Sequence, residues 1–140
     1  MRALSIAVCV MLLFGMLAAQ NVGYQQDPQW HPPADATARA NPLVARPELG
    51  AGGEKLFKRH CVECHGEDGT GLVRKNAADL RLPVVQSQTD GTLFWRITNG
   101  NTGRGMPSFS RLPELQRWQL VLYLRTLKPM PAPPAQESRK

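Results

Sequence analysis

Two cysteines and a histidine near the middle of the chain form its most chemically informative pattern. Cys61 and Cys64 are three positions apart, and His65 follows the second cysteine directly. One helical turn places both sulfurs on the same side, where each can form a thioether to a vinyl group of one porphyrin. The adjacent imidazole can then bind the iron as the proximal axial ligand. The pattern indicates c-type haem attachment, although CxxC also occurs in redox dithiols and in half of a zinc site.

A second candidate is a methionine in a segment rich in glycine. Met106 stands between a glycine and a proline in residues 103–109, which read Gly-Arg-Gly-Met-Pro-Ser-Phe. This composition is typical of an irregular loop, whereas a methionine that only fills core space usually lies on an apolar helix face. Other methionines lie in the apolar first residues or in the proline-rich end of the chain. Met106 is therefore the methionine best placed to act as a ligand.

The first residues have the layout of an export signal. Arg2 is followed by residues 3–19, which carry no charge and end in two alanines. We expect residues 1–19 to be a signal peptide that is removed, with retention as an uncleaved membrane anchor as the alternative. Export suits the Cys-Cys-His pattern, because c-type haem is attached on the outer side of the bacterial inner membrane. We therefore expect a periplasmic protein, anchored to the membrane if the leader is retained.

Prolines divide the rest of the chain. Most of the 12 prolines flank residues 48–128, so we expect a Pro-rich linker or tether at 20–47 and a Pro-rich tail at 129–140. A domain of about 80 residues has a small core and usually needs a staple, which a covalent haem would supply. The net charge is +6, but the basic residues are dispersed without interleaved aromatics. This excludes a nucleic-acid partner and suits either a soluble surface or an acidic partner.

Two helices are expected to frame the site. Residues 48–60 have helical apolar spacing, with acidic residues early and basic residues late. Residues 113–128 begin with a proline suited to a first helical position, and they are apolar on most sides. Gly53 costs about 1 kcal/mol relative to alanine inside a helix, so we expect the two helices to pack closely there. A shorter helix is expected at residues 90–99.

These features together resemble a class I cytochrome c of the small bacterial mono-haem kind. Gly53 and Phe57, with the phenylalanine four residues before the first cysteine, match the first helix of that family. Leu120 and Tyr123 match its last helix. The resemblance covers about residues 49–127. It implies an all-α cytochrome c fold, with three to five short helices around one covalently attached haem c and with the N- and C-terminal helices crossing.

The resemblance also implies the ligands of the iron. Cys61 and Cys64 would carry the thioethers, and His65 and Met106 would be the two axial ligands. Gly105 would permit a close approach of the loop that carries the methionine. The metal would therefore be a single haem iron, and the protein would have no catalytic residues of its own.

The sequence gives several candidates for the residues that hydrogen-bond His65 or the haem propionates. His65 should donate its second ring N–H to a backbone carbonyl, which in many relatives belongs to a nearby proline. Because no proline occurs between His65 and Pro83, we expect the acceptor to be another residue near Gly71 or Leu72. Trp95 would either bond a propionate or be buried in the core. Three arginines are candidates for propionate pairing, against the ordinary role of a solvated charge: Arg74, Arg81 and Arg96.

A haem with both axial positions filled has no open position for a substrate. We therefore expect a one-electron carrier rather than an enzyme, acting between redox partners such as an oxidase, a quinol-oxidising complex or a periplasmic dehydrogenase. The alternative is a haem subunit of a larger respiratory or dehydrogenase complex. A haem peroxidase or gas sensor is less favoured, because it needs Met106 to dissociate. A zinc or dithiol protein is least favoured, because it leaves the Gly-Met-Pro loop unexplained.

Overall fold

The computed structural model describes residues 23–127. The expected leader at 1–19 and the expected tail at 129–140 therefore lie outside the described residues. Within the described part, the chain is helical and forms no β-strand, and an isolated antiparallel bridge pairs Asn101 with Met106. No helix between residues 23 and 127 is both long and apolar enough to cross a membrane.

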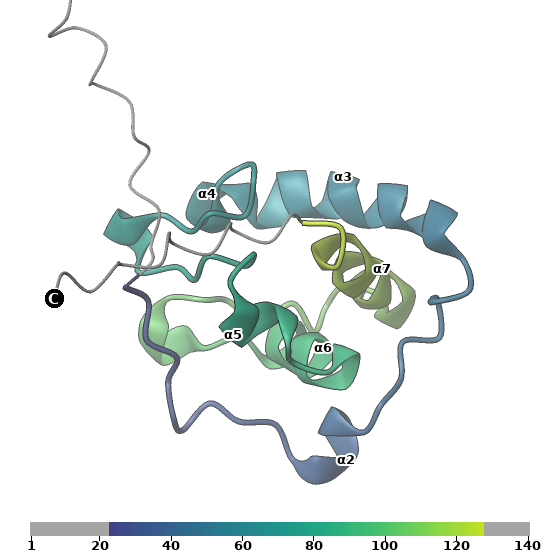
Figure 1. Cartoon of the computed structure of the whole chain (residues 1–140), viewed down its shortest axis with the longest axis horizontal. Helices are drawn as coiled ribbons and strands as arrows, with labels where there is room; N and C mark the ends of the chain where they lie inside the picture. The colour runs from purple at the N-terminus through teal and green to yellow at the C-terminus, as the bar shows by residue number, and fades with distance from the viewer. Residues whose placement is uncertain (1–22, 128–140) are drawn as a thin grey trace, which may run out of the picture.

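Short helices joined by turns and loops make up the fold (Figure 1). The α-helices are α2 (Ala34–Thr37), α3 (Gly50–His60), α4 (Val62–His65), α5 (Pro83–Gln86), α6 (Asp90–Asn99) and α7 (Glu114–Leu124). Three 3-10 turns lie at Pro47–Leu49, Val73–Lys75 and Thr102–Arg104. The all-α prediction is confirmed. The described residues form six α-helices rather than three to five, because α2 lies before the predicted domain.

The crossing of α3 over α7 is the central packing contact, and Figure 1 shows the two helices lying across one another. A Cβ on Gly53 would overlap the carbonyl oxygen of Gln119 and stand 2.9 Å from the Cβ of Tyr123. The rings of Phe57 and Tyr123 lie 5.2 Å apart between centroids. The predicted close packing at Gly53 is confirmed, and its reason is that one backbone touches the other.

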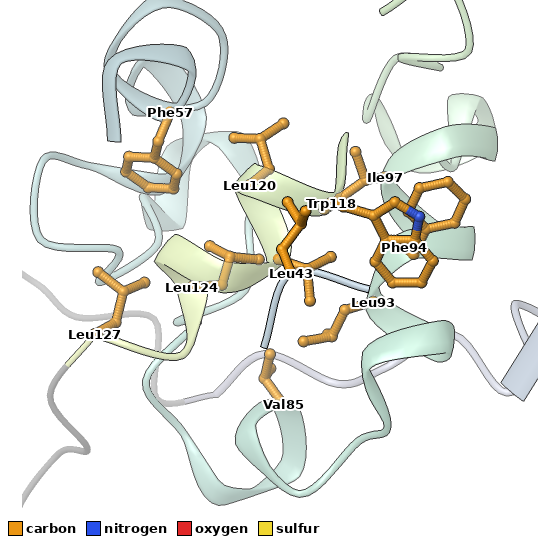
Figure 2. Packing of buried hydrophobic residues seen from close by; sticks show 11 residues of the cluster. Leu43, Phe57, Val85, Leu93, Phe94, Ile97, Trp118, Leu120, Leu124 and Leu127 are labelled. Atoms are coloured by element: carbon orange, nitrogen blue, oxygen red, sulfur yellow. The ribbon is translucent and has the colours of Figure 1, made fainter. Parts of the chain in front are cut away.

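Buried apolar side chains of the described residues pack into a core that includes both crossing helices (Figure 2). Phe94 of α6 and Trp118 of α7 stack with their ring centroids 4.0 Å apart. The core consists of Leu43, Phe57, Val85, Leu93, Phe94, Ile97, Trp118, Leu120, Val121, Leu124 and Leu127. It therefore draws on α3, α5, α6 and α7 together, and α6 is held in place on one side by α7.

The boundaries of the two later helices follow from local hydrogen bonds. Helix α6 covers the predicted residues 90–99, but its cap is Thr89, whose Oγ1 accepts from the backbone N–H of Thr92 at 3.1 Å. Helix α7 ends at Leu124, four residues before the predicted end. Thr126 N donates to Tyr123 O at 2.8 Å, which tightens the chain into a turn after the helix.

Residues 23–47 lie against the helices, which differs from the predicted tether. Leu43 is only 6% exposed and belongs to the core. Asn41 is also buried, and its side-chain amide donates to the carbonyl of Trp118 at 3.3 Å. Gly91 lets α2 approach the start of α6, because a Cβ there would overlap backbone oxygens of the segment. Single residues without helical spacing make these contacts, so no apolar periodicity in the sequence predicted that the segment packs on the helices.

Candidate haem site

One cavity brings together the four residues that the sequence singled out. Cys61, Cys64, His65 and Met106 all line it, although Met106 is 41 residues from the histidine along the chain. Its wall also includes apolar side chains of the core and of the loops: Phe57, Ala77, Ala78, Leu80, Val85, Leu93, Ile97, Phe109, Leu120 and Leu124. The cavity therefore combines sulfur and imidazole donors with a mainly apolar wall, which is the character of a cofactor site.

The two cysteines lie where α3 ends and α4 begins. Cys61 N still donates to Phe57 O at 2.8 Å, so α3 passes directly into the turn that carries the pair. Both thiols are free. Burial raises the pKa of the Cys61 thiol to about 12, with Cys64 adding to the shift. The Cys61 thiol is therefore protonated near pH 7.

His65 is held through its Nδ1 atom. That atom lies 2.9 Å from the carbonyl oxygen of Ala78. A carbonyl can only accept, so Nδ1 carries the proton and Nε2 keeps a lone pair for a metal. Burial lowers the pKa of His65 and outweighs the hydrogen bond to Ala78, which raises it. The ring is therefore neutral near pH 7, the form in which imidazole binds iron.

The acceptor is Ala78, and the prediction of a residue near Gly71 or Leu72 is wrong. Gly71 instead makes the approach of Ala78 possible. Its φ is +71°, and a Cβ there would overlap the carbonyl oxygen of Ala77 and lie 2.6 Å from that of Ala78. Gly71 N also donates to His65 O at 2.8 Å, which closes the loop after the histidine. The available signal was Gly71 with the alanine pair Ala77 and Ala78 further along the chain, but this does not reveal that the chain returns to His65.

A buried ion pair fixes the residue after Ala78. Asp79 is fully buried and accepts two bonds from the Arg81 guanidinium, at 2.9 Å from Nε and 2.8 Å from a terminal nitrogen, and a third from the Arg81 backbone N–H at 2.9 Å. This pairing raises the pKa of Arg81. Arg81 was a propionate candidate, but its guanidinium is taken by Asp79 and it does not line the cavity. Arg74, another candidate, is exposed and also absent from the wall.

Met106 lies in a loop, as its neighbours indicated. Its N–H and C=O pair with Asn101 at 3.0 and 2.9 Å, which forms an isolated antiparallel bridge. Gly100 opens the loop with φ +64°, and a Cβ there would overlap the carbonyl oxygen of Pro107. Gly105 has φ +86°, with no described atom within 4 Å of an added Cβ. Among the described residues, Gly105 is therefore required for its left-handed backbone conformation and not for a close contact.

Arg96 is the one propionate candidate that reaches the cavity. It is 8% exposed, and its guanidinium carbon lies 4.5 Å from the centroid of the Trp30 ring. One terminal nitrogen donates to Trp30 O at 3.2 Å, while Nε has no hydrogen-bond partner among the described residues. Burial lowers the pKa of Arg96. An unpaired N–H on a buried cation at the wall fits an anionic group such as a haem propionate.

Trp30 is the site residue that the sequence did not assign. It lies in the segment expected to be a linker, yet it lines the cavity together with Tyr24 and Gln26. The amide of Gln26, turned so that its oxygen faces the guanidinium, accepts from Arg96. Trp95, the aromatic that was considered, is half-buried on α6 and is not part of the wall. The available signal was a tryptophan after Gln29 in a proline-rich segment that also holds Tyr24.

The crossed helices, the Cys-Cys-His turn and the facing methionine loop define a small class I c-type cytochrome domain. The chain belongs to the family described as cytochrome C oxidase, cbb3-type, subunit III, which matches residues 48–124. Membership implies that the domain binds haem c and works in electron transfer. The comparison with solved structures finds no match.

Proposed function

We propose that the protein transfers single electrons through one haem c, attached by thioethers to Cys61 and Cys64, with His65 and Met106 as axial ligands. The observation that carries the proposal is that these four side chains line one cavity from two separate segments. When bound, the haem iron supplies reversible exchange of one electron without transfer of atoms. The chain would then act as a carrier and not as an enzyme.

The residues around the cavity support this role in distinct ways. The Ala78 carbonyl holds His65 in the tautomer that leaves Nε2 for the metal. Arg96 is a buried cation of the cavity wall, and it would offset the charge of a haem carboxylate there. Buried apolar side chains such as Leu93 and Leu120 exclude water, which favours the less charged ferrous form.

Displacement of Met106 by an external ligand tests the carrier proposal. A carrier keeps the methionine bound, so ferrous protein mixed with carbon monoxide should keep its spectrum over seconds. Met106→Ala, which leaves a ligand position open, should bind carbon monoxide rapidly under the same conditions. Rapid binding by the wild-type protein, at a rate equal to that of the variant, would instead support a gas sensor or peroxidase.

A second candidate is a haem subunit within a respiratory oxidase complex, and the family description favours it. The haem chemistry would be the same, but the electron would pass within an assembly. Purification of the tagged full-length chain from gently solubilised native membranes distinguishes the two. A constant ratio of this chain to oxidase subunits supports the complex, and recovery of the chain alone in the soluble fraction supports the free carrier.

The arrangement of the whole chain is part of the same proposal. Residues 1–19 direct export to the periplasm and are either removed or kept as an anchor, and residues 129–140 form a tail. The haem domain occupies residues 48–128, with the preceding residues 20–47 packed on it where they are described. N-terminal sequencing of the protein recovered from the periplasm tests the leader, and a start at Gln20 is the expected result.

A further inference from the structure

The residues just before α2 contact the loop that carries Met106. We call residues 23–31 the arm and residues 100–107 the methionine loop. The arm is far from the loop in sequence, but Trp30 Nε1 donates to the carbonyl oxygen of Gly100 at 2.7 Å. This bond joins the arm to the first residue of the loop, and its donor is partly buried.

The arm holds two further residues of the loop. Asn101 Nδ2 donates to the Asp27 carboxylate at 3.0 Å. Arg104 donates to the carbonyl of Gln25 at 2.7 Å, and its Nε lies 3.7 Å from the same carboxylate. The bond from Asn101 is the main reason that the pKa of Asp27 is lowered, so the carboxylate is charged near neutral pH. Three loop residues that precede Met106 are thus bound to three arm residues.

The loop has few other restraints near the methionine. The two backbone bonds between Asn101 and Met106 close it. Residues 102–105 are exposed, and they form only a short 3-10 turn. Hydrogen bonds of exposed backbone protect poorly against local opening. The contacts from the arm therefore supply much of what keeps this loop in one conformation.

The arm is itself anchored on the wall of the cavity. The Trp30 ring lies over the Arg96 guanidinium, and the Trp30 carbonyl accepts from it at 3.2 Å. Tyr24, Gln26 and Trp30 line the cavity, and they alternate along the arm with Gln25 and Asp27, which bind the loop. One short segment thus touches both the methionine loop and the candidate propionate site.

We propose that the arm is a positioning strap, in which Asp27 and Trp30 hold the methionine loop closed so that the Met106 sulfur stays on the iron. The proposal rests on the proposed function, because it takes Met106 as a ligand. Asp27 and Trp30 act through the loop and do not touch the ligand themselves. Loosening them raises the fraction of molecules with an open loop, and an external ligand can replace the methionine in those molecules.

Competition by imidazole for the ferric protein tests the strap. The variants are Asp27→Ala, which removes the carboxylate, and Trp30→Phe, which removes the N–H donor and retains a ring beside Arg96. Asp35→Ala removes an exposed carboxylate from α2 and is the matched control. We expect each test variant to bind imidazole about tenfold faster than wild type and the control to match wild type.

Amide hydrogen exchange gives a second readout that does not depend on ligand binding. The N–H groups of Asn101 and Met106 should exchange about tenfold faster in Asp27→Ala, while those of α7 should keep their wild-type rates. A general loss of stability would speed both sets. In a double-mutant cycle, Asn101→Ala should add little to Asp27→Ala, because both remove the same bond.

The outcomes separate this proposal from the proposed function. A sulfur-to-iron charge-transfer band in the ferric wild-type spectrum shows that Met106 is bound. If wild type has this band and both test variants match the control in imidazole binding and amide exchange, the strap is overturned and the ligand assignment stands. If wild type lacks that band, both fail. Trp30→Phe keeps the test decisive if Asp27→Ala does not fold, because it removes one donor and keeps the aromatic packing.

Discussion

His65 Nδ1 lies 2.9 Å from the carbonyl oxygen of Ala78, a residue thirteen positions further along the chain. The contact joins the Cys-Cys-His turn to the loop that precedes α5. It also links the histidine to the buried carboxylate of Asp79, the very next residue. The orientation of the candidate proximal ligand therefore depends on a buried ion pair outside the cavity.

Asp79→Asn should destabilise the protein and disturb His65. The substitution leaves Arg81 without its charged partner in a mostly buried position, so the free energy of unfolding should fall by about 3 kcal/mol. The Ala78 carbonyl should then lose its fixed position, which shifts the Nδ1–H proton resonance of His65. Urea denaturation and proton NMR measure the two effects.

Asp68→Asn is the control for that prediction. Asp68 is exposed, and it acts on Arg81 only through space. Its loss should change the free energy of unfolding by less than about 0.5 kcal/mol and leave the His65 resonance in place. Equal effects of the two substitutions would contradict a specific role for the buried pair.

Gly53→Ala should be strongly destabilising because the helices touch there. The new methyl group would overlap the Gln119 carbonyl, so α3 and α7 would have to separate. We expect a loss of about 2–3 kcal/mol in the free energy of unfolding. Gly50→Ala, on the same helix, would place its methyl 3.9 Å from Leu122, so it should be neutral or slightly stabilising. Thermal denaturation of both variants measures the contrast.

Arg96→Gln should lower the midpoint potential of the haem. A buried positive charge at the cavity wall disfavours the ferric state, so its removal stabilises that state. We expect a fall of about 30–60 mV, which for one electron is a change of up to about tenfold in the equilibrium constant. Arg111→Gln removes an exposed arginine that is not part of the wall. Redox titration measures the midpoint potentials of Arg96→Gln and Arg111→Gln. An equal shift of the two potentials from the wild-type value would refute the role of Arg96.

Glu114 should contribute to the acid sensitivity of the fold. Its carboxylate accepts from Trp118 Nε1 at 3.2 Å and pairs with Arg39, and these contacts, in that order, lower its pKa. A lowered pKa in the folded state stabilises the protein above the ordinary glutamate pKa of about 4.3, and this contribution is lost as the pH falls through the lowered value.

Urea denaturation at about pH 6 and about pH 3 measures this loss, because the two values bracket the titration of Glu114. Wild type should lose more stability between these two pH values than Glu114→Gln does, since the amide cannot titrate. An equal loss in the two proteins would show that the contacts of Glu114 add nothing.

The helix crossing and helix α6 could be predicted, because the residues that specify them have one clear physical role. Gly53 indicated the helix crossing because only a glycine lets two backbones touch, and the apolar spacing of residues 90–99 located α6. The packed segment before α3 was not predictable. Leu43 and Asn41 enter the core as single residues, and no periodic pattern distinguishes them from a proline-rich linker.

The sequence predicted the candidate haem ligands and thioether cysteines, but not the residues that hold them in position. Cys61, Cys64, His65 and Met106 were named from spacing and resemblance, and the structure gathers them at one cavity. Ala78 acts through its carbonyl, which every residue has, so its identity carried no signal. Trp30 acts through a long-range contact across the fold, which only the tertiary structure reveals.

The near-infrared absorption spectrum of the ferric, exported protein tests whether Met106 is an axial ligand of a covalently attached haem. We expect one covalently bound haem with a sulfur-to-iron charge-transfer band, and we expect Met106→Ala to lose the band while the haem stays attached. Haem that can be extracted without breaking a covalent bond, or a band that survives in Met106→Ala, would contradict the assignment of Cys61, Cys64, His65 and Met106.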